Sequence, residues 1–201
     1  MLLDTSHQHT KRALPDPDRV VNLGARATEA RVKGLSADGT LARARVVHFA
    51  THGLVAGETA LFAENHAEPA LLLTPPDTDS EEDDGLLTAS EVTALKLDAD
   101  WVILSACNTA AGDSVGGNAL SGLARAFFYA GARALLVSLW YVDSEATVAL
   151  ITKSFDALKA DPKMGRAERR SMAALIAAGG RTAHPSAWAP FVVVGEGGAG
   201  R

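Results

Sequence analysis

The chain has 201 residues, of which 47% are hydrophobic and 21% are charged, and its formal net charge is −5. This composition is typical of one globular domain, and the acidic balance argues against a general nucleic-acid-binding protein, which would present a basic face. The single cysteine excludes an internal disulfide and a zinc site built from several cysteines. The sequence shows no signal-peptide pattern and no apolar run of the roughly 20 residues that cross a bilayer, so we expect a cytoplasmic protein without membrane contact.

One domain accounts for most of the sequence. Residues 1–20 are polar and contain two prolines, which predicts an irregular N-terminal arm. We expect the domain to span residues 21–195 and residues 196–201 to form a flexible tail. Within the domain, residues 75–85 contain six carboxylates, which repel one another and favour a solvated, flexible acidic loop. The spacing of these carboxylates does not follow the ligand rhythm of an EF-hand, so a cation site is disfavoured.

Runs of apolar residues predict strands that alternate with helices. The expected strands are residues 45–51, 61–62, 70–73, 101–106, 134–140 and 191–194. The expected helices are residues 24–35, 120–128 and 165–178, one helix that follows Asp143-Ser144, and a short one after Thr88. Thr88 and Glu91 have the spacing of a capping box, and Gly131 is expected to end its helix with a positive φ. The alternation indicates an α/β fold with a mainly parallel sheet covered on both faces.

Two of the expected strands lead directly into side chains of reactive type. The run 45–51 is followed by His52 and Gly53, and the run 101–106 is followed by Cys107. Sites form at the carboxyl ends of strands in an open parallel sheet, where a thiol and an imidazole would make a nucleophile with an acid–base partner. The spacing resembles the roughly 50 residues that separate histidine and cysteine in caspase-type sites. The competing interpretation is that the cysteine is a small buried hydrophobe and the histidine is structural.

Other residues of reactive type give weaker signals. His48 has the strand parity of His52 but lies in the middle of its strand, which predicts a buried structural histidine. The Gly-rich segment 112–117 matches neither the P-loop nor the dinucleotide-binding pattern, so a phosphate site is disfavoured. Ser105 lacks the glycines of the G-x-S-x-G elbow, which argues against a serine hydrolase.

Seven short motifs occur in order along the chain. They are His48–Gly53, Asp84–Val92, Leu104–Thr109, Leu123–Phe127, Ala130–Arg133, Ser138–Asp143 and His184–Phe191. With them the chain resembles the CHAT-domain family, caspase-like peptidase domains often fused to tetratricopeptide repeats, over roughly residues 25–195. The resemblance implies a caspase–haemoglobinase-like three-layer α/β sandwich, with a mainly parallel sheet and helices on both faces. It also implies a cysteine endopeptidase that acts on a protein or peptide substrate.

The resemblance assigns roles to individual residues. His52 would be the catalytic histidine and Cys107 the nucleophile, and the backbone N–H groups of Gly53 and Cys107 would form the oxyanion hole. Asp143 and Glu145 are candidates for binding a basic substrate side chain, although Asp143 can equally cap a helix. The implied chemistry uses no metal and no organic cofactor, and a tetratricopeptide-repeat protein is the candidate regulatory partner.

The matched region starts late by comparison with the family. The family's domain usually carries a further segment with a strand before the matched part, so we expect an N-terminally truncated domain. This departure keeps a second function open, in which the chain is a catalytically silent CHAT-fold module that binds or regulates another protein.

Overall fold

The computed structural model describes residues 2–4, 20–59, 68–78, 80, 83–105, 122–140, 142–160 and 164–196. Its main sheet has six strands in the order β2-β1-β3-β7-β8-β9. Their bounds are β1 Leu2–Asp4, β2 Val21–Leu23, β3 Val46–Ala50, β7 Trp101–Leu104, β8 Ala134–Ser138 and β9 Phe191–Gly195. Every neighbouring pair is parallel except β8 and β9, which confirms the expected mainly parallel sheet.

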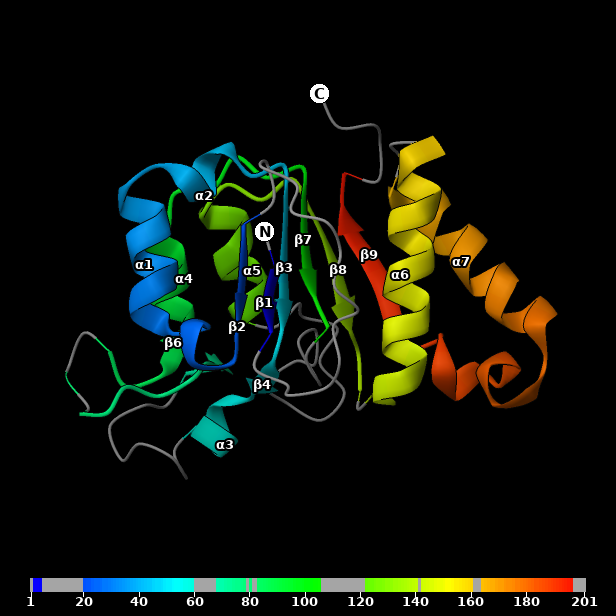
Figure 1. Cartoon of the computed structure of the whole chain (residues 1–201), viewed down its shortest axis with the longest axis horizontal. Helices are drawn as coiled ribbons and strands as arrows, with labels where there is room; N and C mark the ends of the chain where they lie inside the picture. The colour runs from blue at the N-terminus through cyan, green and yellow to red at the C-terminus, as the bar shows by residue number, and fades with distance from the viewer. Residues whose placement is uncertain are drawn as a thin grey trace.

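A second, smaller sheet follows β3 in the chain. It consists of β4 His52–Leu54, β5 Ala70–Leu72 and β6 Leu86–Thr88, and its strands are antiparallel. Because β4 begins two residues after β3 ends, the small sheet lies at the edge of the main sheet where the parallel strands have their carboxyl ends (Figure 1).

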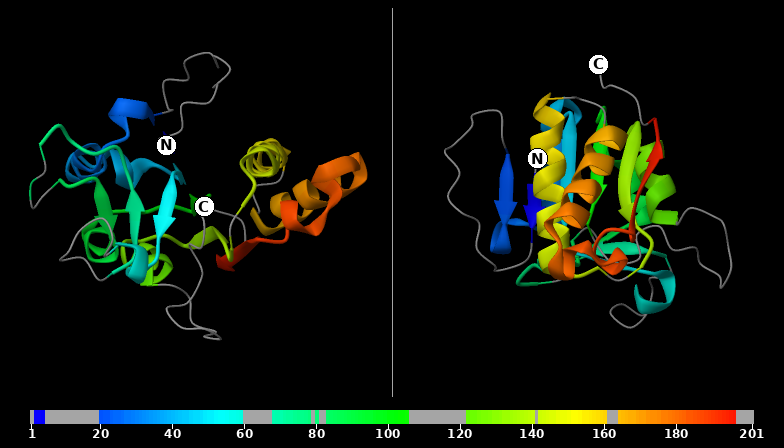
Figure 2. Two further views of the ribbon diagram at one scale, coloured as in Figure 1. Left: turned by 90° about the horizontal axis from the view of Figure 1, so that it is seen from below. Right: turned by 90° about the vertical axis from the view of Figure 1, so that its right-hand side faces the viewer.

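Helices cover both faces of the main sheet. The α-helices are α1 Glu29–Ala37, α2 Thr40–Arg43, α3 Ala56–Thr59, α4 Ala89–Ala94, α5 Gly122–Tyr129, α6 Ser144–Ala160 and α7 Met164–Ala178. The 3-10 turns are η1 Gly24–Arg26, η2 Gly180–Ala183 and η3 Pro185–Ala187. Helices α1, α4 and α5 lie on one face and α6 and α7 on the other (Figures 1 and 2), so the fold is the expected three-layer α/β sandwich.

The sandwich follows from strands that are apolar on both faces. In β7, Val102 and Leu104 belong to the core beneath α1, α4 and α5, whereas Trp101 and Ile103 belong to the core beneath α6 and α7. Strand β8 alternates in the same way between the two cores. Successive side chains of a strand point to opposite faces, so a continuous apolar run requires helices on both sides.

Several local predictions are confirmed. Glu91 accepts the backbone N–H of Thr88 at 2.9 Å while Thr88 Oγ1 accepts the N–H of Glu91 at 3.3 Å, which completes the capping box that begins α4. Gly131 follows α5 with a φ of +110°. The expected strands 45–51, 101–106 and 134–140 are present, each shorter at its carboxyl end. The expected strand at residues 61–62 lies outside the described residues.

Two local predictions need correction. Within the expected arm of residues 1–20, Leu2–Asp4 form β1, whose backbone pairs with β2 on one side and β3 on the other. The expected helix over 24–35 is divided, because Thr28 Oγ1 accepts the N–H of Arg31 at 3.2 Å and thereby starts α1 at Glu29. The preceding residues form the separate turn η1.

The carboxyl-terminal end of the acidic segment, residues 75–85, is held in place by α1. Glu29 Oε2 accepts the backbone N–H groups of Asp84 at 3.0 Å and Gly85 at 3.1 Å. Gly85 has a φ of +82°, and a Cβ on it would lie 2.9 Å from Pro75 Cα, so the two ends of the segment approach closely. The last residues of the expected flexible loop are therefore held by α1.

Candidate functional site

The strands that precede the two expected catalytic residues lie side by side. β3 and β7 are parallel neighbours, with Val47 opposite Val102 and Phe49 opposite Leu104. Just beyond β7, the backbone N–H of Ser105 donates to Phe49 O at 3.2 Å. The carboxyl ends of these strands therefore meet at one edge of the main sheet, next to β4 (Figure 1).

His52 occupies a fixed backbone position with an exposed side chain. It is the first residue of β4, where it pairs with Leu72 of β5, and Gly53 pairs with Leu71. The residue before it, Thr51, is buried and its hydroxyl donates to Leu72 O. The small sheet thus holds the backbone of His52 in place while its imidazole remains accessible.

Cys107 lies outside the described residues, as does the Gly-rich segment 112–117. Strand β7 ends at Leu104, and the described residues of this segment end at Ser105, two positions before Cys107. The Cys107–His52 dyad and the oxyanion hole formed by Gly53 and Cys107 therefore stay predictions, whereas the adjacency of the two strands is an observation.

His48 is the buried structural histidine that the sequence predicts. Its side chain is 9% exposed, and burial lowers its pKa from 6.5 to about 4, so the ring is neutral near pH 7. Its Nε2 lies 2.8 Å from Ser105 Oγ, and its ring centroid lies 6.3 Å from that of Phe155 on α6. The buried ring cannot serve as an acid or base toward a substrate.

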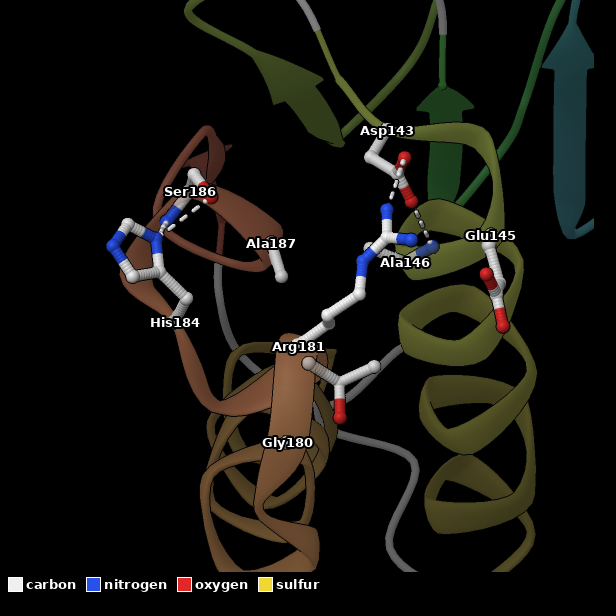
Figure 3. A pocket seen from close by; sticks show the side chains of 9 residues that line it. Asp143, Glu145, Ala146, Gly180, Arg181, His184, Ser186 and Ala187 are labelled. Carbon is white, nitrogen blue, oxygen red and sulfur yellow. Dashed lines mark hydrogen bonds and ion pairs between the residues drawn. The ribbon is translucent and has the colours of Figure 1, made fainter.

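A cleft of about 550 Å³ lies between the start of α6 and the turns η2 and η3 (Figure 3). Asp143 Oδ1 accepts the backbone N–H of Ala146 at 2.9 Å and so caps α6, while Oδ2 lies 3.8 Å from Arg181 Nη2. Glu145 also lines the cleft, but Figure 3 shows its side chain on the flank of α6 that points away from Arg181. Of the two acidic candidates, Asp143 is the one that faces a cation.

Comparison with known proteins identifies the family. A family model described as the CHAT domain matches residues 6–196. This chain belongs to the CHAT-domain family. It is 31% identical to tetratricopeptide repeat protein 28 of Mus musculus and 30% identical to that of Homo sapiens, in each case over 87% of this chain and 8% of the relative. The chain thus spans less than a tenth of the length of these relatives, which are named as tetratricopeptide repeat proteins.

The CHAT domain also contains interactions that its sequence did not indicate. The partnership of His48 with Ser105 and the contact of Asp143 with Arg181 both join residues from distant segments. In the described part of the chain, no group of three or more His, Cys, Asp or Glu residues is arranged to hold a metal ion. Among the described helices, none combines the length and apolar character needed to span a membrane.

Proposed function

We propose that this CHAT domain is a caspase-like cysteine endopeptidase in which Cys107 is the nucleophile and His52 the acid–base residue. The observation that carries the proposal is the parallel pairing of β3 with β7, which joins Phe49 to Ser105 at 3.2 Å. His52 follows Phe49 by three residues, and Cys107 follows Ser105 by two. Two residues of extended chain span at most about 7 Å and three residues at most about 11 Å, so both side chains belong to segments anchored at one point of the sheet edge.

The proposed reaction follows from these groups. The Cys107 thiolate attacks the substrate carbonyl carbon, and the C–S bond forms as the carbonyl oxygen becomes an oxyanion. The N–H groups of Gly53 and Cys107 would donate to that oxyanion. His52 then gives a proton to the amide nitrogen, the C–N bond breaks, and the amine leaves. Water hydrolyses the resulting thioester with His52 as the base, which restores the thiol.

The cleft beside α6 supports a preference for basic substrates. The elements that line it, the start of α6 and the turns η2 and η3, lie at the same edge of the sheet as β4, where the parallel strands end (Figure 1). Asp143 presents Oδ2 to the cleft, and the protein's own Arg181 is the cation beside it at 3.8 Å. A substrate arginine or lysine would take the place of Arg181 at this carboxylate, with Glu145 adding negative charge nearby.

Alkylation of the single cysteine tests the dyad without knowledge of the substrate. An imidazolium near a thiol lowers the thiol pKa, so iodoacetamide should react with the wild type at pH values where an isolated cysteine, with a pKa of about 8.5, is mostly protonated. His52→Ala should slow the reaction near pH 6.5 about ten-fold, and Cys107→Ala gives the blank. A peptide electrophile should show the same dependence on His52. Equal alkylation of the wild type and His52→Ala would reject the dyad.

The alternative is a catalytically silent module that binds or regulates another protein. It is favoured by the relatives, whose names describe tetratricopeptide repeats and of whose length the matched domain covers 8%. In that case the wild type would cleave no peptide, its alkylation profile would match His52→Ala, and Cys107→Ala would retain partner binding. A repeat-containing protein is the first partner to test under either function.

A further inference from the structure

A polar pair connects the two strands directly upstream of the proposed dyad. His48 Nε2 lies 2.8 Å from Ser105 Oγ, and Ser105 Oγ donates to Phe49 O at 3.3 Å. The backbone N–H of Ser105 donates to the same carbonyl at 3.2 Å. His48 precedes His52 by four residues and Ser105 precedes Cys107 by two. Three contacts from one serine thus tie the end of β3 to the end of β7.

The pair is neutral in either proton arrangement. A Ser105 hydroxyl that donates to Phe49 O leaves Oγ to accept the ring N–H of His48, whereas a hydroxyl that donates to Nε2 requires the ring proton on Nδ1. In both tautomers one hydrogen bond joins the imidazole to the serine, and the ring stays in its buried position against Phe155 of α6.

The backbone between the polar pair and His52 has a second tie. The Thr51 hydroxyl donates to Leu72 O of β5, so the chain is held to the main sheet at Phe49 and to the small sheet at Thr51. Only Ala50 separates these two anchor residues. Rotation of this short segment would displace His52, whereas directional hydrogen bonds at both ends oppose that rotation.

We propose that His48 and Ser105 are positioning residues, which hold the strand ends in the register that brings the Cys107 thiol to the His52 imidazole. The inference rests on the proposed endopeptidase function. Apolar side chains at these two positions would fill the same core but would not fix the direction of the strand ends. A displacement of about 1 Å at a reacting pair can reduce rates up to a hundred-fold, so a modest loss of register has a measurable effect.

The test is the pH profile of Cys107 alkylation by iodoacetamide, measured with the full chain. Ser105→Ala and His48→Leu each remove the polar pair and should slow alkylation near pH 6.5 about ten-fold, because the thiol loses its imidazole neighbour. His48→Gln keeps an N–H donor and Ser105→Thr keeps a hydroxyl, so both should stay within about two-fold of the wild type. If His48 and Ser105 only stabilise the fold, the two groups of variants should have the same rate of Cys107 alkylation at temperatures below unfolding.

Ser171→Ala is the matched control. It removes another buried serine pair, in which Ser154 Oγ lies 3.1 Å from Ser171 Oγ between α6 and α7. It should lower the melting temperature without changing the alkylation profile. If Ser105→Ala does not fold, His48→Asn replaces it, because the shorter amide cannot reach Ser105 Oγ.

The outcomes separate the two proposals. If the wild type reacts no faster than His52→Ala, the endopeptidase proposal fails and the positioning role fails with it. If the wild type does react faster but Ser105→Ala, or in its place His48→Asn, retains that advantage, only the positioning role is overturned.

Discussion

Glu29 and Gly85 are 56 positions apart in the sequence, and the carboxylate of Glu29 accepts the backbone N–H of Gly85 at 3.1 Å. The same carboxylate accepts the N–H of Asp84 and pairs with Lys33 at 2.6 Å, while its side chain is 1% exposed. Lys33 continues to Glu91, the acidic member of the capping box, at 2.7 Å. A partly buried chain of ion pairs and hydrogen bonds thus connects α1, the carboxyl-terminal end of the acidic segment and α4.

Removal of this carboxylate should destabilise the fold. Glu29→Ala leaves the N–H groups of Asp84 and Gly85 without their acceptor and leaves Lys33 with one partner fewer. We expect a loss of about 2–4 kcal/mol in the free energy of unfolding, measured with urea. Lys159→Ala breaks an exposed ion pair with Asp156 and should change stability by less than about 0.5 kcal/mol. Similar effects of the two substitutions would contradict a structural role for Glu29.

Gly131 should tolerate no side chain. Its φ is +110°, and a Cβ would lie 2.2 Å from Leu97 O, so Gly131→Ala should cost about 2 kcal/mol or more. Gly34 in α1 is the matched control, because a Cβ there meets nothing within 4 Å. Gly34→Ala should instead stabilise the protein by about 0.5–1 kcal/mol, since alanine favours the helix. Thermal unfolding of the two variants should shift in opposite directions.

Burial of His48 should make folding sensitive to acid. The pKa of its imidazole falls from 6.5 to about 4 in the folded protein, so between these values the unfolded chain binds more protons. Its contribution to stability is complete above pH 6.5 and is lost as the pH falls toward 4, by about 3 kcal/mol in total. Urea unfolding at several pH values should show a smaller acid loss for His48→Gln than for the wild type. If stability falls equally with decreasing pH in the wild type and in His48→Gln, His48 is not the source of the acid sensitivity.

Glu168 should have the opposite pH dependence. Its side chain is 6% exposed, no partner for its Oε1 is present among the described residues, and burial raises its pKa from 4.5 to about 7. The folded state then binds more protons between these values, so stability declines as the pH rises through them. Glu168→Gln should match the wild type near pH 4 and exceed it by about 1–3 kcal/mol near pH 8. Equal stability of Glu168→Gln and the wild type near pH 8 would show that the folded protein offsets the cost of burying the charged Glu168 carboxylate.

His48 and Glu29 show which features of the fold the local sequence predicts and which it does not. The position of His48 in the middle of an apolar strand predicted its burial, and the continuous apolar runs of β7 and β8 predicted two helical layers. Ser105 could not be identified as the partner of His48, because the register of β3 against β7 joins residues 57 positions apart. The acid at the start of α1 has the sequence signature of an ordinary first-turn glutamate, and only the tertiary fold places Gly85 against it.

The strand β1 illustrates the same limit. A run of three residues is too short to produce a periodic signal, and the pairing with β2 and β3 that makes it a strand is set by distant segments. For the candidate site, the edge of the sheet and the place of His52 beyond the end of a strand followed from the positions of apolar runs. The contact of Asp143 with Arg181 did not, since η2 follows α7 and returns to α6 only in three dimensions.

Arg181 should compete with basic substrates for Asp143. The ion pair is 3.8 Å long and its side chains are 87% and 51% exposed, so solvent screens it and a substrate cation can displace it. If the endopeptidase proposal holds, Arg181→Ala should raise kcat/KM about two- to five-fold for a peptide with arginine before the scissile bond, and leave a peptide with alanine there unchanged. Asp143→Asn should remove the preference for arginine while an asparagine still caps α6. Lys159→Ala, which removes an exposed cation elsewhere on α6, should change neither rate. An equal increase for both peptides after Arg181→Ala would mean that Arg181 blocks the cleft sterically and that Asp143 does not read substrate charge.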